Sequence, residues 1–286
     1  MHSIRARIVD VFAPEALAGA PTGIVQPPPE VALDDDQRAA VASELVPEAT
    51  AVINAVEGHT IHIGCVGPDR PEHERLPLAS LLAVHEGELS ADTYTVETAT
   101  QQHEIEITDT GTVWQTVGEG TPTVDAIDTT EVANAVEIDP STFDPVGLTP
   151  AIATVGRSWL VLAVPYVSDL KRITPTTDLT DRWDVAGVYA MTFETVENTS
   201  TVHARAFIDG KEVPAVPSGA AAAGAYLQRQ DAVESPELRI EQGDLIGRAG
   251  RIDVRSEHAV HVGGRGVCGL KGTLSVPESG TDIIEV

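Results

Sequence analysis

Residues 201–230 read TVHARAFIDGKEVPAVPSGAAAAGAYLQRQ, and this stretch decides the fold. Polar and apolar side chains alternate over 202–208, which predicts a strand. After a turn rich in charge, Gly and Pro, Ser218 opens a run of small apolar residues that reaches Leu227. Ser is a favoured N-cap, because its hydroxyl accepts from an early helical N–H. A helix that is apolar on every side is predicted to be buried, with other backbone packed closely around it.

The start of this predicted helix allows two interpretations. Free N–H groups and the helix dipole converge at a helix N-terminus, so the turn before Ser218 could form an anion site. Alternatively, Ser218 only caps a core helix. The segment by itself leaves both interpretations open.

The composition is that of a strongly acidic globular protein. The 286 residues include 44 Asp and Glu against 18 Lys and Arg, a net charge of −26. This length suggests two domains. An acidic surface repels phosphate backbones and anionic lipids, so we expect neither nucleic acid nor membrane as a partner. Dispersed acidity with only Lys171, Lys211 and Lys271 as lysines is typical of a halophile's protein, since 1 M salt screens charges beyond roughly 3 Å.

The N-terminal segment lacks the apolar stretch of a signal peptide, and no run approaches the ~18 apolar residues of a membrane span. We therefore expect a cytoplasmic protein.

The cysteines and histidines do not predict a metal site. Cys65 and Cys268 lack metal-ligand spacing and are expected to be two buried thiols. A racemase pair of these thiols is a weaker alternative, because neither opens a predicted helix. The GxGxxG pattern at 264–269 precedes no helix, which argues against a dinucleotide site. The polar candidates expected on solvated turns are Glu72, His73, Glu74, Asp209 and Glu212. The isolated histidines, expected in the core or on the surface, are His203, His258 and His261.

The two halves of the chain repeat one order of elements. A Gly-led strand is followed by helix, strand, a strand with a central His, a Pro-containing turn that ends in Ser, and a helix. The matching segments are 19–27 with 156–165, IHIG (61–64) with VHAR (202–205), and LPLAS (76–80) with VPAVPS (213–218). Such a repeat predicts two similar lobes, each a curved sheet around one buried helix, with a site in the cleft between them.

Turn residues dominate 118–128, which we take as the domain boundary. Residues 1–118 are expected to form the N-terminal lobe and 119–274 the C-terminal lobe, with a last strand in 275–286 returning to the first lobe.

The motifs resemble the phenazine biosynthesis PhzF-like family, which is related in fold to diaminopimelate epimerase. The resemblance covers most of the chain and is carried by DVFAPEALAGAPTGIV (10–25), WLVLAVP (159–165), VHARAF (202–207), GAYL (224–227), LRIEQG (238–243), GRAGRIDVR (247–255) and VGGRGV (262–267). It implies an α+β fold of two pseudo-symmetric lobes, a mixed sheet around a central helix in each, and a homodimer. It also implies a cofactor-free proton shift on a small carboxylate-bearing substrate, with acid and base groups facing each other across the cleft.

The chain departs from this family where the chemistry is expected. The family's catalytic Glu, His and Asp correspond to Ala49, Leu81 and Val213. Pro217 replaces a Gly whose N–H would serve an anion, and Pro has no N–H. The resemblance therefore implies the family scaffold without its usual acid and base groups.

Substitute site residues can be named. Glu48 is the candidate catalytic carboxylate, and Ser80, Leu81, Ser218 and Gly219 are the candidate substrate-binding residues. Two functions stay open: an isomerase whose proton relay uses Glu48, Ser80 and Ser218, or a catalytically inactive paralogue that binds a small molecule or another subunit through the cleft.

Overall fold

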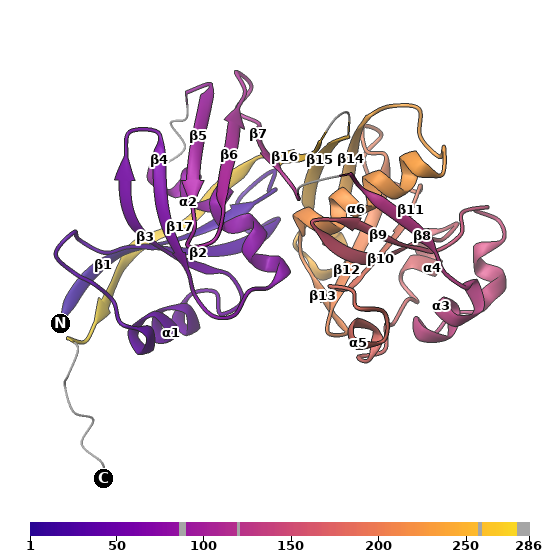
Figure 1. The fold of residues 1–286 in the computed structure, drawn as a ribbon, viewed down its shortest axis with the longest axis horizontal. Coiled ribbons are helices and arrows are strands. Elements are labelled where there is room, and N and C mark those ends of the chain that lie inside the picture. Colours follow the sequence, from indigo (N-terminus) through magenta and orange to yellow (C-terminus); the bar gives the residue numbers. More distant parts are fainter. Residues whose placement is uncertain (86–89, 119–120, 257–258, 279–286) are drawn as a thin grey trace, which may run out of the picture.

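Two lobes lie side by side, each a strongly curved mixed sheet with a helix inside it (Figure 1). The computed structural model describes residues 1–85, 90–118, 121–256 and 259–278. The predicted α+β fold of two pseudo-symmetric lobes is confirmed. None of the helices in these ranges is long and apolar enough to cross a membrane.

The first lobe contains a continuous series of strands and two helices. Its elements are β1 (His2–Val11), β2 (Ala20–Gln26), α1 (Asp35–Glu44), β3 (Thr50–Glu57), β4 (Thr60–Cys65), the 3₁₀ turn η1 (Pro71–Arg75), α2 (Leu76–His85), β5 (Asp92–Glu97), β6 (Gln102–Ile107) and β7 (Val113–Thr116). Helix α2 is the inner helix and packs against β1, β2, β4 and β5.

The second lobe adds short outer helices to the same plan. Its elements are β8 (Thr123–Ala126), α3 (Thr129–Ala135), η2 (Pro140–Phe143), β9 (Ala151–Val155), β10 (Arg157–Ala163), α4 (Val167–Leu170), α5 (Leu179–Trp183), β11 (Val188–Thr192), β12 (Val202–Ile208), β13 (Lys211–Val213), α6 (Pro217–Arg229), β14 (Glu237–Gln242), η3 (Asp244–Ile246), β15 (Gly250–Ser256) and β16 (Val260–Gly264). The last strand of the chain is β17 (Gly266–Val276), which belongs to the first lobe.

The strand pairings confirm the internal repeat. From β1 to β7, successive neighbours pair antiparallel, parallel, antiparallel, parallel, antiparallel and antiparallel. The series β9, β10, β11, β12, β14, β15 and β16 follows the same order. Helix α2 connects the parallel pair β4 and β5, and α6 connects the parallel pair β12 and β14. The two inner helices are therefore equivalent.

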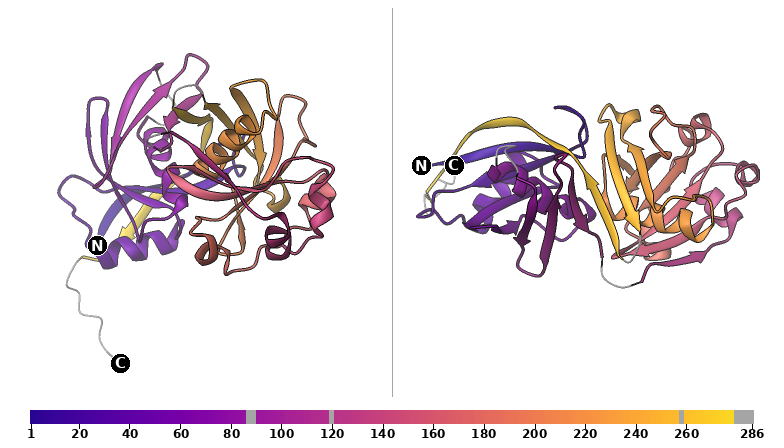
Figure 2. Two further views of the ribbon diagram at one scale, coloured as in Figure 1. Left: turned by 45° about the vertical axis from the view of Figure 1, so that its right-hand side comes forward. Right: turned by 90° about the horizontal axis from the view of Figure 1, so that it is seen from above.

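The end of the chain ties the lobes together. Strand β17 returns to the first lobe and pairs along β1, from Gly266 opposite Val11 to Val276 opposite His2 (Figure 2). The strand that returns to the first lobe thus begins at Gly266, whereas the sequence predicted it in 275–286. Residues 279–286 lie outside the described residues. Strand β16 pairs with β7, which joins the two sheets at a second place. The division of the chain at residue 118 stays a prediction.

Helix α6 is buried from Pro217 to Leu227, as its all-apolar sequence predicted. Its start differs from the prediction, because the N-cap is Val216 and Pro217 takes the first helical position. Pro is well suited to that position, since its φ is preset and its missing N–H would be unpaired anyway. Ser218 therefore lies inside the first turn, and its hydroxyl accepts a 2.9 Å hydrogen bond from Trp159 Nε1 instead of capping.

Candidate functional site at the lobe boundary

The 3₁₀ turn before α2 meets the start of α6 where the lobes touch. Glu74 Oε2 accepts a 2.9 Å hydrogen bond from the backbone N–H of Ser218. Glu74 Oε1 accepts a 2.8 Å bond from Arg157 Nε. The N-terminus of α6 is thus an anion site, as one interpretation of the sequence held, and the anion is a side chain of the chain itself.

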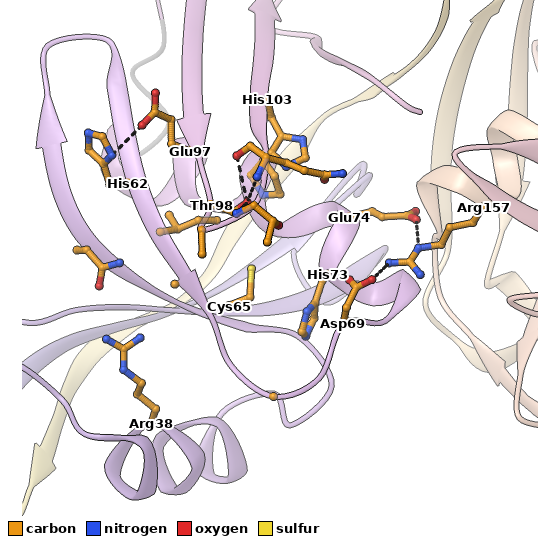
Figure 3. Close-up of a pocket in the computed structure, with 18 residues that line it drawn as sticks. Arg38, His62, Cys65, Asp69, His73, Glu74, Glu97, Thr98, His103 and Arg157 are labelled. Carbon is orange, nitrogen blue, oxygen red and sulfur yellow. Dashed lines mark hydrogen bonds and ion pairs between the residues drawn. The ribbon is translucent and has the colours of Figure 1, made fainter. Parts of the chain in front are cut away.

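Arg157 lies on the second lobe and forms ion pairs with the first lobe. Its Nη2 lies 2.6 Å from Asp69 Oδ2, so one guanidinium bridges two carboxylates of the first lobe (Figure 3). The Glu74 side chain is 19% exposed and that of Arg157 is 30% exposed. Burial raises the pKa of the Glu74 carboxyl, although the hydrogen bonds from Ser218 and the charge of Arg157 oppose the shift. We call Asp69, Glu74, Arg157 and Ser218 the boundary cluster.

A second arginine, Arg75, is buried next to the cluster. Its Nε donates to Thr22 Oγ1 at 3.2 Å and its Nη2 to the Pro21 carbonyl at 3.3 Å. Its Nη1 is buried and has no hydrogen-bond partner among the described residues. Burial lowers the pKa of Arg75 to about 10, against the opposing charges of nearby Glu72 and Glu48. The group is therefore a cation held in place largely by neutral oxygens.

The expectation that 72–74 form a solvated turn is wrong. Glu72 and His73 are 6% and 8% exposed, and Arg75 is 3% exposed. The reason is tertiary: η1 packs between α2 and α6, so residues with the composition of a surface turn are enclosed by the second lobe. Burial lowers the pKa of His73 to about 4.

Glu48, the predicted catalytic carboxylate, lies on the exposed side of the turn before β3. Its charge raises the pKa of Arg75, which places it near that guanidinium. The adjacent Ala49 has no exposed surface. A catalytic role for Glu48 stays a prediction.

Ser80 and Leu81 lie inside α2 and have no exposed surface. The predicted repeat places LPLAS (76–80) in a turn before the helix, but α2 begins at Leu76. The LPLAS segment is therefore helical, whereas VPAVPS lies before and at the start of α6. The two segments are therefore not equivalent in position. In the part of the chain that the structure describes, Ser80 Oγ has no hydrogen-bond partner. Substrate binding by Ser80 and Leu81 stays a prediction, and in this arrangement neither residue has surface to offer a ligand.

Ser218 and Gly219 do lie at the boundary, in the first turn of α6. Both polar groups of Ser218 are engaged, the N–H by Glu74 and the hydroxyl by Trp159. Gly219 fits under a ring, because a Cβ there would lie 2.6 Å from Tyr189 Cδ2. The structure thus gives Gly219 a packing role, and substrate binding by the pair stays a prediction.

At Val213, which corresponds to the family's Asp, the hydrogen bonds are formed by uncharged groups. Val213 ends β13, and its carbonyl accepts from Gln242 Nε2 at 3.3 Å. The Oε1 of Gln242 accepts a 2.9 Å bond from Tyr189. No carboxylate takes part in these bonds, so this side of the boundary is held by amide and phenol groups.

Other sequence candidates lie elsewhere. His203 is a core residue with each ring nitrogen 3.9 Å from a carboxylate, those of Glu241 and Asp244. Asp209 is on an exposed turn as expected, whereas Glu212 pairs with Arg205 at 2.7 Å.

His261 is half-buried and lies 3.2 Å from Thr116 Oγ1, while His258 lies outside the described residues. Cys65 and Cys268 are only half-buried, which corrects the expectation of two buried thiols. Within the described ranges no three His, Cys, Asp or Glu residues gather as a metal site would require.

A groove of about 650 Å³ opens beside the boundary cluster, on the first lobe (Figure 3). It is bordered by α1, β4, the β5–β6 hairpin and η1. Its lining includes Arg38, Cys65, His73, His103 and Glu97. The volume suits a small molecule, for which sites of roughly 300–1,000 Å³ are usual.

The comparisons with known proteins agree with this architecture. The family model for phenazine biosynthesis-like proteins (PhzC-PhzF) matches residues 9–272. A PhzF-family phenazine biosynthesis protein from Bacillus anthracis has a similar fold, with a TM-score of 0.81 and 18% identity over 96% of this chain and 100% of that chain. A predicted epimerase from Pseudomonas aeruginosa gives a TM-score of 0.73 and 22% identity over 94% of this chain and 98% of that chain. No curated protein matches.

The chain therefore belongs to the phenazine biosynthesis-like protein family. The residues that sequence reasoning missed are Glu74, Arg75 and Arg157. Only the run of charges PEHER before an apolar helix could have drawn attention to the first two.

Proposed function

We propose that this chain does not carry out the family's proton shift at the lobe boundary and instead serves as a small-molecule-binding member of the family. One observation carries the proposal. The carboxylate of Glu74 fills the N-terminus of α6, where the resemblance implies that a substrate carboxylate binds. A substrate would have to displace a side chain that is already held by Ser218 and Arg157.

The groups around this contact support the same conclusion. Proton transfer needs a base within hydrogen-bond reach of the substrate carbon or its proton. The positions that correspond to the family's acid and base groups are Ala49, Leu81 and Val213, and the first two are fully buried in the core. The carboxylates of Asp69 and Glu74 are both engaged in ion pairs with Arg157.

A cofactor-free proton shift on a small carboxylate is the second candidate. Burial raises the pKa of Glu74, and a carboxyl group that holds its proton at higher pH than usual is suited to acid–base work. In that case Glu74, rather than the proposed relay of Glu48, Ser80 and Ser218, would be the group that exchanges protons.

The proposal that Glu74 fills the site at the start of α6 is tested by removing the Glu74 carboxylate. In Glu74→Ala the N–H of Ser218 loses its acceptor and Arg157 keeps only its ion pair with Asp69, so added acetate can take the place of the Glu74 carboxylate. We expect acetate to raise the melting temperature of Glu74→Ala in a saturable way, because a ligand that binds only the folded state stabilises it. Wild type and Glu74→Gln, whose side chains still fill the site, should not respond. Equal stabilisation of wild type by acetate would contradict the proposal.

Catalysis is tested separately by incubating a panel of small carboxylic acids with the protein in D₂O. We expect no solvent deuterium at any α-carbon. Deuterium incorporation that is lost in Glu74→Gln but kept in Glu48→Gln would favour the second candidate. Incorporation that is lost in Glu48→Gln would restore the relay predicted from the sequence.

We also propose that the protein is a halophile's cytoplasmic homodimer. The support is the net charge of −26, together with the resemblance, which implies a dimer. Sedimentation analysis at low and at high salt tests both ideas, since a halophilic dimer should persist at high salt and weaken as screening is removed. A monomer at every salt concentration would contradict the dimer.

A further inference from the structure

The outer end of the groove carries a notch of hydrogen-bond donors. Arg38 lies on α1, and its Nε donates to the Leu33 carbonyl at 3.0 Å, which fixes the plane of the guanidinium. Its Nη1 lies above Gly64 so closely that a Cβ on Gly64 would be 2.7 Å away. The same point is 3.4 Å from Asn54 Nδ2. We call Arg38, Asn54 and Gly64 the Arg38 notch.

The position of Asn54 results from a β-bulge. The pairing of β3 with β4 passes from Ile53 opposite Ile63 to Ala55 opposite His62, so Asn54 is an extra residue without a partner on β4. A bulge redirects a side chain and is common beside binding sites. Here it brings the Asn54 side-chain amide next to the Arg38 guanidinium, over Gly64, which has no side chain.

The charge of Arg38 is available to a ligand. Throughout the described parts of the chain, no carboxylate forms an ion pair with its guanidinium, although the protein has 44 acidic residues. At the inner end of the groove, the charge of Arg157 is already neutralised by Asp69 and Glu74. Burial lowers the pKa of both His73 and His103, so these side chains offer hydrogen bonds rather than positive charge near neutral pH. Arg38 is thus the cation that can anchor an anion in this groove.

We propose that the Arg38 notch binds the carboxylate or phosphate group of a small molecule whose polar body lies along the groove toward His103. A guanidinium with two unpaired Nη groups matches the two oxygens of such an anion. The amide of Asn54 adds a neutral donor beside it, and the groove of about 650 Å³ accommodates the rest of the molecule. The inference rests on the proposed binding function for its biological meaning. The Arg38 notch itself contains no residue of the boundary cluster, whereas Asp69, Glu74 and Arg157 line the inner end of the groove.

The test is a titration followed by NMR, with acetate, succinate and inorganic phosphate as probes at constant ionic strength. We expect saturable shifts of the backbone amide of Gly64 and of the Asn54 side-chain amide. Arg38→Gln should weaken binding by about tenfold or more, as expected for a lost charged hydrogen bond. The probe that saturates at the lower concentration identifies carboxylate or phosphate as the preferred group.

Gly64→Ala is the sharper variant, because it keeps the Arg38 charge and places a methyl group in the notch. We expect it to weaken binding to a similar degree. The matched control is Gly272→Ala on β17, where a Cβ would meet no atom within 4 Å, and it should bind as wild type does. Circular dichroism melting curves of all three variants verify that they are folded.

Two results would overturn the proposal. One is the absence of saturable shifts at Gly64 in wild type, and the other is unchanged affinity in both Arg38→Gln and Gly64→Ala. Neither result affects the acetate rescue of Glu74→Ala, because that experiment depends on Ser218 and Arg157 alone. The two proposals therefore fail separately.

Discussion

The carboxylate of Glu74 in the first lobe accepts a 2.9 Å hydrogen bond from the N–H of Ser218, at the start of the buried helix of the second lobe. A helix N-terminus in the interior requires an acceptor, because its first N–H groups have no partner within the helix. In this chain the acceptor comes from η1, the turn that leads into the equivalent helix of the other lobe. The contact therefore connects the two lobes, and the Glu74 side chain occupies the space at the start of α6.

The ion pair of Arg157 with Glu74 should contribute measurably to stability. Its side chains are 30% and 19% exposed, so it lies between a surface pair and a buried one. We expect Arg157→Gln to lower the free energy of unfolding by about 1–2 kcal/mol, with a smaller loss for Arg157→Lys. In a double-mutant cycle by urea denaturation, Glu74→Gln should remove part of that cost, because Asp69 still pairs with Arg157. Additive losses in the cycle would show that the two groups do not interact.

The raised pKa of Glu74 predicts a pH dependence with a defined sign. A carboxyl group whose pKa is higher in the folded state stabilises the fold below its ordinary pKa of 4.5, and this contribution is lost as the pH rises through the folded-state pKa. The stability of wild type relative to Glu74→Gln should therefore fall as the pH rises from below 4.5. Urea denaturation at a series of pH values measures this difference. A relative stability that increases with pH would mean that the pKa is lowered.

His73 predicts the opposite trend. Burial lowers its pKa from 6.5 to about 4, so the unfolded chain takes up the proton first as the pH falls. The stability contribution is complete above pH 6.5 and is lost between 6.5 and about 4. The loss should be at most about 3 kcal/mol relative to His73→Gln, which does not titrate. Parallel stability curves for the two proteins across this range would rule out a buried neutral imidazole.

Gly219 should tolerate no side chain. An added Cβ would lie 2.6 Å from Tyr189 Cδ2 and 2.9 Å from Cε2, in a fully buried part of α6. We expect Gly219→Ala to lower the free energy of unfolding by about 1–3 kcal/mol through overpacking. The usual gain of about 1 kcal/mol for Gly→Ala within a helix would be outweighed.

Gly272→Ala on β17 serves as the control for Gly219→Ala, because its Cβ would meet no neighbouring atom. Thermal or urea denaturation of both variants measures the contrast. An increase in stability for Gly219→Ala would mean that the Tyr189 ring moves aside easily.

Local sequence patterns determined the elements and their order. Alternation of polar and apolar residues over 202–208 predicted the strand that the structure has as β12 (Val202–Ile208). The repeat of elements predicted two equivalent lobes, and the all-apolar run after Ser218 predicted a buried α6. These features follow from the period of side-chain burial, which a single segment already expresses.

Tertiary structure alone decided the site. Glu74 and Ser218 are 144 residues apart, and no local signal pairs them. The charged turn at 71–75 has the composition of a solvated surface, and it is buried because the second lobe packs over it.

The sequence also could not fix whether the serines of the repeat would lie at equivalent helix positions. Pro217 starts α6 next to Ser218, whereas α2 starts earlier and encloses Ser80. The sequence thus determined a two-lobed scaffold and left open whether the start of α6 is an anion site. Packing of one lobe on the other determined that a carboxylate of this same chain fills it, because that pairing depends on long-range contacts and not on local periodicity.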